Sequence, residues 1–144
     1  KATEDGTAGA EMMDRQAGHA TYNTIPSVIY TAPEVASVGK TEEELKKNNI
    51  TYKIGKFPFS ANGKAKVMNE TSGFVKILSD KNTDEVLGVH IIGADAGNLI
   101  GELTIAMEFG ASAEDIARTC HAHPTLTESI KEAALNVDNQ AIHI

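Results

Sequence analysis

Three short segments in the middle of the chain restrict its fold most strongly. Tyr52 to Phe59, Gly73 to Ser79 and Val86 to Ile92 are runs of strand length, rich in β-branched, aromatic and other apolar residues. The turn Lys81-Asn82-Thr83-Asp84 separates the last two runs. Because consecutive strands joined by short links pair antiparallel, the sequence predicts an antiparallel sheet.

Helical patterns surround these strands, so the expected fold class is α+β, with an antiparallel sheet flanked by helices. Lys1 to His19 and Ala113 to Thr119 have helical composition, and Thr41 to Glu44 forms a capping box that opens a further short helix. Ser27 to Thr31 is expected to add a short strand.

The helix expected from Gly97 to Phe109 is apolar on nearly all sides. Leu99 and Leu103 fall on one face, whereas Ile105 and Phe109 fall on another. Such a helix must be covered on nearly all sides. The sheet can cover one face, and either a partner subunit or a loop of the same chain can cover the other.

Composition excludes several classes of partner. The net charge of −7 argues against nucleic acid, because a phosphate-binding surface needs an excess of Lys and Arg. No apolar run approaches the roughly 18 residues that a membrane span requires. The single cysteine excludes a disulfide framework, and we expect Cys120 to be a small buried apolar side chain.

One run near the C-terminus carries the strongest chemical signal. His123 and Pro124 precede Thr125-Leu126-Thr127-Glu128, which has the form of a capping box in which the glutamate turns back toward the helix start. If Glu128 accepts the proton of His123 Nδ1, then Nε2 is left free to accept a proton from a substrate. The same spacing also fits a helix cap without catalytic function.

Other candidate residues carry weaker signals. His121 and His123 are two apart in an extended segment, so they point to opposite sides and no metal site is predicted. His90 is expected to be a packed or hydrogen-bonded residue of a strand. A hydrolase that uses Ser129 or Thr127 as nucleophile is a further possibility, although no nucleophile elbow is present.

The same C-terminal run resembles a family signature. His-Pro-Thr-x-x-Glu followed by an alanine-rich helix is similar to the end of the pyridine nucleotide-disulfide oxidoreductases, and Glu114 to Thr125 resembles the branch that oxidises dihydrolipoamide. The resemblance extends from Ile25 to Leu135. Its upstream matches are Pro26 to Thr31, Pro33 to Gly39, Lys56 to Phe59 and Leu87 to Ile91.

The resemblance implies the fold of the FAD- and NAD-linked reductase dimerisation domain and a role in a homodimer. It implies that His123 is the general base and Glu128 its orienting partner, both serving the disulfide of the other subunit. It also implies that the backbone of His123 and Pro124 lies near the flavin. By the same resemblance the enzyme would use FAD and NAD and associate with 2-oxo acid dehydrogenase complexes and their lipoyl domains. Its location would be the mitochondrial matrix in a eukaryote or the cytoplasm in a bacterium.

The chain lacks other parts that this resemblance would require. It has one cysteine rather than a redox-active pair, and it has no G-x-G-x-x-G fingerprint. We therefore expect residues 1–22 to be the remnant of a preceding FAD-binding domain and linker, and residues 23–144 to be the dimerisation domain. Alone, the chain is expected to bind no cofactor and to be inactive. The alternatives are a glutathione or trypanothione reductase type and a pure interaction module.

Overall fold

A computed structural model describes all residues from Lys1 to Ile144 and contains a five-stranded antiparallel sheet with six α-helices. This confirms the predicted α+β class. The elements in chain order are α1 (Ala2–Met13), a 3-10 helix η1 (Tyr22–Thr24), β1 (Ser27–Ile29), β2 (Glu34–Gly39), α2 (Glu42–Lys47), β3 (Tyr52–Pro58), a 3-10 helix η2 (Phe59–Ala61), α3 (Gly63–Met68), β4 (Phe74–Asp80), β5 (Val86–Gly93), α4 (Ala96–Glu108), α5 (Ala113–Arg118) and α6 (Glu128–Asn136).

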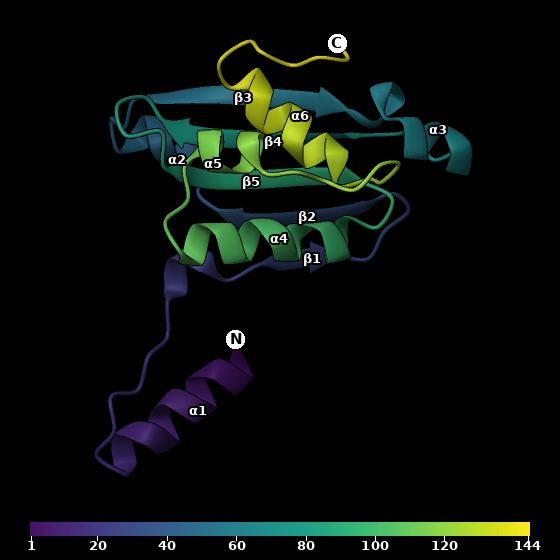
Figure 1. Cartoon of the computed structure of the whole chain (residues 1–144). Coiled ribbons are helices and arrows are strands. Elements are labelled where there is room, and N and C mark those ends of the chain that lie inside the picture. Colours follow the sequence, from purple (N-terminus) through teal and green to yellow (C-terminus); the bar gives the residue numbers. More distant parts are fainter.

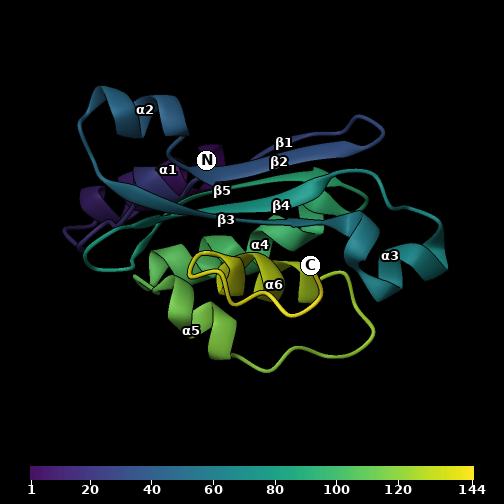
Figure 2. The same ribbon diagram turned by 90° about the horizontal axis from the view of Figure 1, so that it is seen from above.

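The strands lie in the order β1-β2-β5-β4-β3, and every neighbouring pair is antiparallel. The three strands predicted in the middle of the sequence are β3, β4 and β5, which lie side by side. Helices α4, α5 and α6 cover one face of the sheet, whereas α2 lies on the other (Figures 1 and 2). The fold therefore has a helix layer on one side and a largely open sheet on the other.

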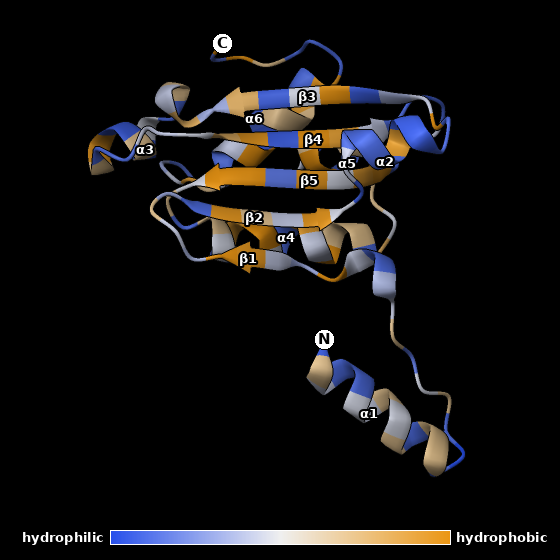
Figure 3. Cartoon of the chain, turned by 180° about the vertical axis from the view of Figure 1, so that it is seen from behind, coloured by the Kyte–Doolittle hydropathy of each residue, from blue (hydrophilic) through white to orange (hydrophobic).

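The core lies between the sheet and this helix layer. Alternate residues of β4 show the strand period, because Val75 and Ile77 are fully buried while Lys76 between them is not. Figure 3 shows the open face, where hydrophilic and hydrophobic residues alternate along the strands. The largest fully buried side chains of the core cluster are Phe57, Phe59, Ile77, Ile91, Ile100, Leu103, Val38, Val75, Val89 and Ile130.

Strand β2 and helix α3 were not predicted. Strand β2 turns Ala36 and Val38 toward the core, where they pair with Ile91 and Val89 of β5, and Glu34 on the same face accepts a hydrogen bond of 2.8 Å from the Gly97 N–H of α4. Its residues form a strand because β5 offers an unpaired edge, not because their own propensity is high. Helix α3 is a single short element whose start depends on a side-chain cap from Asn62.

Helix α1 ends at Met13, six residues before the predicted His19, and lies apart from the sheet (Figure 1). Met12 and Met13 are exposed, and Ala8 is the one buried residue of the helix. No helix of the chain has the length and apolar character that a membrane crossing requires.

Helix α6 packs directly on β3 at Gly55. A Cβ atom at this position would lie 2.0 Å from the carbonyl oxygen of Ala133 and 2.7 Å from Cγ2 of Val137. Both residues belong to or directly follow α6, whose Ile130 and Ala133 are fully buried. The absence of a side chain at Gly55 therefore sets how closely α6 approaches the sheet.

We expect Gly55→Ala to lower the free energy of unfolding by about 1–3 kcal/mol, the range typical of overpacking. The added methyl group can be accommodated only if α6 moves away from β3. Urea denaturation of the chain measures the change. Gly63→Ala is the matched control, because a Cβ there meets no atom within 4 Å. Equal unfolding free energies for the two variants would contradict this account of the α6 contact.

Candidate functional site

His123 and Glu128 form a hydrogen-bonded pair. His123 lies in the irregular segment after α5, and Glu128 is the first residue of α6. His123 Nδ1 lies 2.9 Å from Glu128 Oε1. The His123 side chain is 77% exposed, whereas the Glu128 side chain is 26% exposed. With Nδ1–H donated to Glu128, the Nε2 atom is left to accept a proton from another molecule.

The second oxygen of Glu128 is also engaged. Glu128 Oε2 accepts a hydrogen bond of 2.9 Å from the backbone N–H of Thr125. The carboxylate therefore cannot rotate without losing one of its two bonds, and it holds the imidazole ring in one orientation. Its place in the first turn of α6 also suits a negative charge, because the helix dipole is positive there.

The capping box predicted for Thr125 to Glu128 is only half present. Thr125 Oγ1 donates to the carbonyl of Ala122 at 2.7 Å instead of accepting from the Glu128 N–H. Helix α6 begins at Glu128 with Thr127 as its N-cap, and Thr127 makes no side-chain capping bond. The prediction that Glu128 turns back to the Thr125 N–H is confirmed. The prediction that Thr125 caps the helix was wrong, because α6 starts later than the spacing suggested and Glu128 is not its third residue.

The surroundings of Glu128 favour its ionised form. Partial burial disfavours the charge, but the hydrogen bonds from the Thr125 N–H and the His123 ring outweigh this effect and hold the pKa of Glu128 below its ordinary value. The carboxylate is therefore an anion at neutral pH. An anion beside Nδ1 stabilises the imidazolium that forms when Nε2 takes up a proton.

Two residues that the sequence did not single out hold this segment. Asn62 is buried and donates from Nδ2 to the carbonyl of Thr125 at 3.0 Å, while its Oδ1 caps α3. Lys131 of α6 donates from Nζ to the carbonyls of Ala117 and Thr119, at 2.6 Å and 2.8 Å. The only sequence signal was Asn62 before Gly63, a common N-cap arrangement.

The other histidines and Cys120 serve different purposes. His121 pairs with Glu102 rather than Glu128, so the two neighbouring histidines face different carboxylates. No group of three or more His, Cys, Asp or Glu side chains is arranged to hold a metal ion.

His90 is hydrogen-bonded, as predicted, with Nε2 3.1 Å from the carbonyl of Lys40. Cys120 is exposed, and the prediction that it is buried was wrong, because His121 takes the inward position instead.

The structure argues against a hydrolase that uses Ser129 or Thr127. The Ser129 side chain is fully buried, so it cannot reach a substrate, and its hydroxyl has no hydrogen-bond partner in the chain. The Thr127 hydroxyl lies 2.8 Å from that of Thr125, not beside the His123 ring. Neither hydroxyl is therefore placed for activation by His123.

Helix α4 leaves one apolar face uncovered. Ile105 is 62% exposed and Phe109, which directly follows the helix, is 85% exposed, whereas Leu99 and Leu103 are buried against the sheet. The Ile105 and Phe109 side chains stay exposed although they line a cavity that faces α1 and the segment before β1. Near the other end of α4, the exposed Tyr30 follows strand β1.

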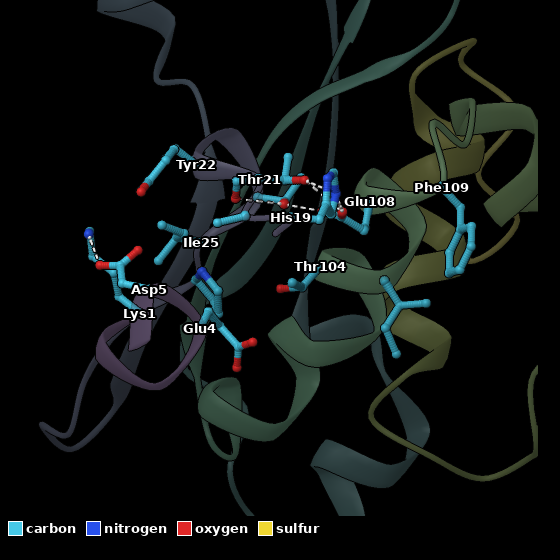
Figure 4. Close-up of a pocket in the computed structure, with 14 residues that line it drawn as sticks. Lys1, Glu4, Asp5, His19, Thr21, Tyr22, Ile25, Thr104, Glu108 and Phe109 are labelled. Atoms are coloured by element: carbon cyan, nitrogen blue, oxygen red, sulfur yellow. Dashed lines mark hydrogen bonds and ion pairs between the residues drawn. The ribbon is translucent and has the colours of Figure 1, made fainter. Parts of the chain in front are cut away.

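A cavity of about 470 Å³ lies between α1, the segment before β1 and the end of α4 (Figure 4). On its wall Glu108 accepts hydrogen bonds from the hydroxyls of Thr24 and Thr21, and these bonds, that of Thr24 first, hold its pKa below the ordinary value. His19 Nε2 lies 3.5 Å from the same carboxylate. The bonds from Thr21 and Thr24 to Glu108 fasten the N-terminal segment to α4. None of the residues that line the cavity belongs to the His123 site.

Comparison with known sequences identifies the family. A sequence profile described as "Pyridine nucleotide-disulphide oxidoreductase, dimerisation domain" matches residues 25–134. The chain belongs to this family. Its five-stranded sheet and helix layer are thus the fold that the resemblance implied, and the exposed face of α4 belongs to a domain whose family is defined by dimerisation.

Several curated proteins similar to this chain are named dihydrolipoyl dehydrogenase. The mitochondrial protein of Dictyostelium discoideum is 58% identical over 144 residues, which are 100% of this chain and 30% of that protein. The protein of Trypanosoma brucei brucei is 58% identical over 135 residues, which are 94% of this chain and 28% of that protein. The chain thus spans less than a third of the length of these relatives.

Solved structures share the fold of the dimerisation domain. LpdA from Mycobacterium tuberculosis superposes with a TM-score of 0.82 at 25% sequence identity, covering 88% of this chain and 28% of that one. The flavoprotein disulfide reductase RclA from Escherichia coli, solved as a Cu(II) complex, has a TM-score of 0.81 at 22% identity over 92% of this chain and 30% of that one. The RclA match supports the fold alone.

The lowered pKa of Glu128 predicts how stability depends on pH. A carboxyl with a depressed pKa stabilises the folded chain above its ordinary pKa of about 4.3, and this contribution is lost as the pH falls through the folded-state pKa. We expect the free energy of unfolding to fall more steeply on acidification in the wild-type chain than in Glu128→Gln. Urea denaturation at a series of pH values measures both slopes. Identical slopes would mean that Glu128 gains nothing from Thr125 and His123.

Proposed function

We propose that this chain is the dimerisation domain of an FAD-dependent dihydrolipoamide dehydrogenase, in which His123 and Glu128 act as an acid–base pair. The observation that carries the proposal is the hydrogen bond between His123 Nδ1 and Glu128 Oε1, which leaves an exposed Nε2 as the base. The names of the relatives support the dihydrolipoamide branch over the glutathione and trypanothione reductase types.

In this proposal the chain contributes proton transfer and not electron transfer. FAD, NAD+ and a redox-active cysteine pair supply the redox chemistry of such an enzyme. His123 Nε2 takes the proton of a substrate thiol, so that the sulfur becomes a nucleophilic thiolate. Glu128 keeps Nδ1 protonated and stabilises the imidazolium until the proton is released.

The exposed position of His123 supports a role toward another subunit. A base that is 77% exposed in this chain needs a second surface to exclude water from the reaction. We infer a homodimer in which each chain supplies His123 to the disulfide of its partner. His123 and Pro124 are both exposed, which fits a contact of their backbone with the partner's flavin. The chain carries no glycine-rich loop that could bind the phosphates of FAD or NAD.

The remaining assignments follow from the same proposal. Residues 1–22 would belong to a preceding FAD-binding domain and linker, and residues 23–144 to the dimerisation domain. The enzyme would serve 2-oxo acid dehydrogenase complexes through their lipoyl domains. The mitochondrial relatives support a location in the mitochondrial matrix, and a bacterial enzyme would be cytoplasmic.

Exchange of His123 in the flavoenzyme that contains this chain tests the catalytic role. We expect His123→Gln to lower kcat for dihydrolipoamide oxidation by about 10²–10⁴-fold, the usual contribution of general acid–base catalysis, while FAD remains bound. Glu128→Gln should cost less, because an amide still forms hydrogen bonds. Turnover is followed by NADH absorbance, and the chain alone serves as an inactive baseline. Near wild-type turnover of His123→Gln would reduce the motif to a structural turn.

Self-association tests the dimerisation role. We expect the chain alone to form a dimer, because an exposed apolar face such as that of Ile105 and Phe109 is otherwise a liability. Ile105→Glu should shift the chain to the monomer in analytical ultracentrifugation. Val67→Glu is the matched control, because Val67 is also an exposed apolar side chain but lies on α3. A strictly monomeric wild-type chain at high concentration would contradict this role for α4.

A further inference from the structure

The segment between α5 and α6 carries His123 but contains no helix or strand of its own. Cys120, Ala122 and His123 are exposed, so the apolar core does not hold this part of the segment. A base on an irregular segment keeps its position only if specific contacts fix the backbone. The backbone before His123 must therefore be fixed by contacts of its neighbouring residues.

His121 is the inward-pointing residue of this segment. Its side chain is only 5% exposed, and Nε2 lies 2.8 Å from Glu102 Oε1. Its Nδ1 lies 3.0 Å from the carbonyl of Thr119. Both ring nitrogens therefore lie within hydrogen-bond distance of an oxygen atom. The imidazole links the start of the segment to helix α4.

Glu102 is a rigid attachment point. It lies in the middle of α4, between Leu99 and Leu103, which are buried against the sheet. From the opposite side, Lys131 of α6 donates to the same Thr119 carbonyl that faces His121. The start of the segment is thus held between α4 and α6, and α6 also carries Glu128.

We propose that Glu102 and His121 are positioning residues for the acid–base pair, so that the chain uses one His–Glu pair to place another. This inference rests on the proposed function of His123. The Glu102–His121 bond fixes the backbone two residues before His123, and the Glu128 bond then fixes its ring. Neither Glu102 nor His121 contacts the substrate in this arrangement.

The consequence for catalysis follows from distance. Displacing a catalytic group by about 1 Å can cost on the order of 10²-fold in rate. Removing the Glu102 carboxylate breaks the bond that ties His121 to α4, and the segment can then shift relative to α6. The loss should appear in kcat and not in KM, because the misplaced group is the base and not a binding surface.

The test uses the full-length flavoenzyme that contains this chain. We expect Glu102→Ala to lower kcat by about 10–100-fold with little change in KM, and Glu102→Gln, which keeps an acceptor oxygen, to lower it less. Glu114→Ala is the matched control. Glu114 is an exposed helical carboxylate near the same segment, and its ion pair with Arg118 at 2.6 Å does not involve His121. Flavin content and solution mass are measured for each variant.

The deciding measurement combines Glu102→Ala with His123→Gln. If Glu102 acts through His123, the double variant should be no slower than His123→Gln alone. If Glu102 instead supports folding or assembly in general, the two losses should multiply, and the inference is overturned. Should Glu102→Ala fail to fold, the same cycle with Glu102→Gln decides the question at smaller amplitude.

The two proposals fail in different ways. Wild-type kcat for Glu102→Ala together with a large loss for His123→Gln would refute the positioning role and leave the catalytic role of His123 intact. Near wild-type kcat for His123→Gln itself would refute the proposed function. In that case any effect of Glu102→Ala would have to arise elsewhere.

Discussion

The contact of α6 with strand β3 is the interaction on which the rest of the site depends. Gly55 lets the helix backbone approach the strand, and Ile130 and Ala133 fill the space beneath it. Polar bonds reinforce the contact, since the Lys56 N–H donates to Asn136 Oδ1 at 2.9 Å. With α6 fixed in this way, the sheet indirectly sets the position of Glu128.

The same helix organises the segment that precedes it. Glu128 at its start bonds His123 and Thr125, and Lys131 one turn later bonds the carbonyls of Ala117 and Thr119. The irregular segment is therefore bound at both its ends to one rigid element. Asn62, which follows β3, adds a bond to the Thr125 carbonyl. An irregular segment placed by helices can hold a base as precisely as a helix could.

Exposure connects the two functions assigned to the domain. The base His123 and the apolar side chains Ile105 and Phe109 all lie outside the core of the chain. Burying the apolar side chains is favourable in water, so it can drive association with another copy. In the proposed dimer that association would also bring His123 to the partner's disulfide, so catalysis would depend on assembly.

Local patterns in the sequence were sufficient for several features. The strands β3, β4 and β5 follow from apolar runs and turn residues, and α4 follows from its apolar period. The proximity of His123 and Glu128 also follows from sequence, because the two residues are close together in the chain. Their hydrogen bond needs only local geometry, although the exact start of α6 was missed.

Other features depend on residues that are distant in sequence, and only the tertiary structure decided them. Strand β2 exists because β5 offers a pairing edge. The Glu102–His121 pair forms because α4 and the segment between α5 and α6 pack on the same face of the sheet. The same packing buries the side chain of His121 and leaves Cys120 exposed. Sequence determines which residues can form a base and its partner, since that depends on nearest neighbours. Tertiary packing determines what holds them, since each supporting contact joins elements that the chain itself separates.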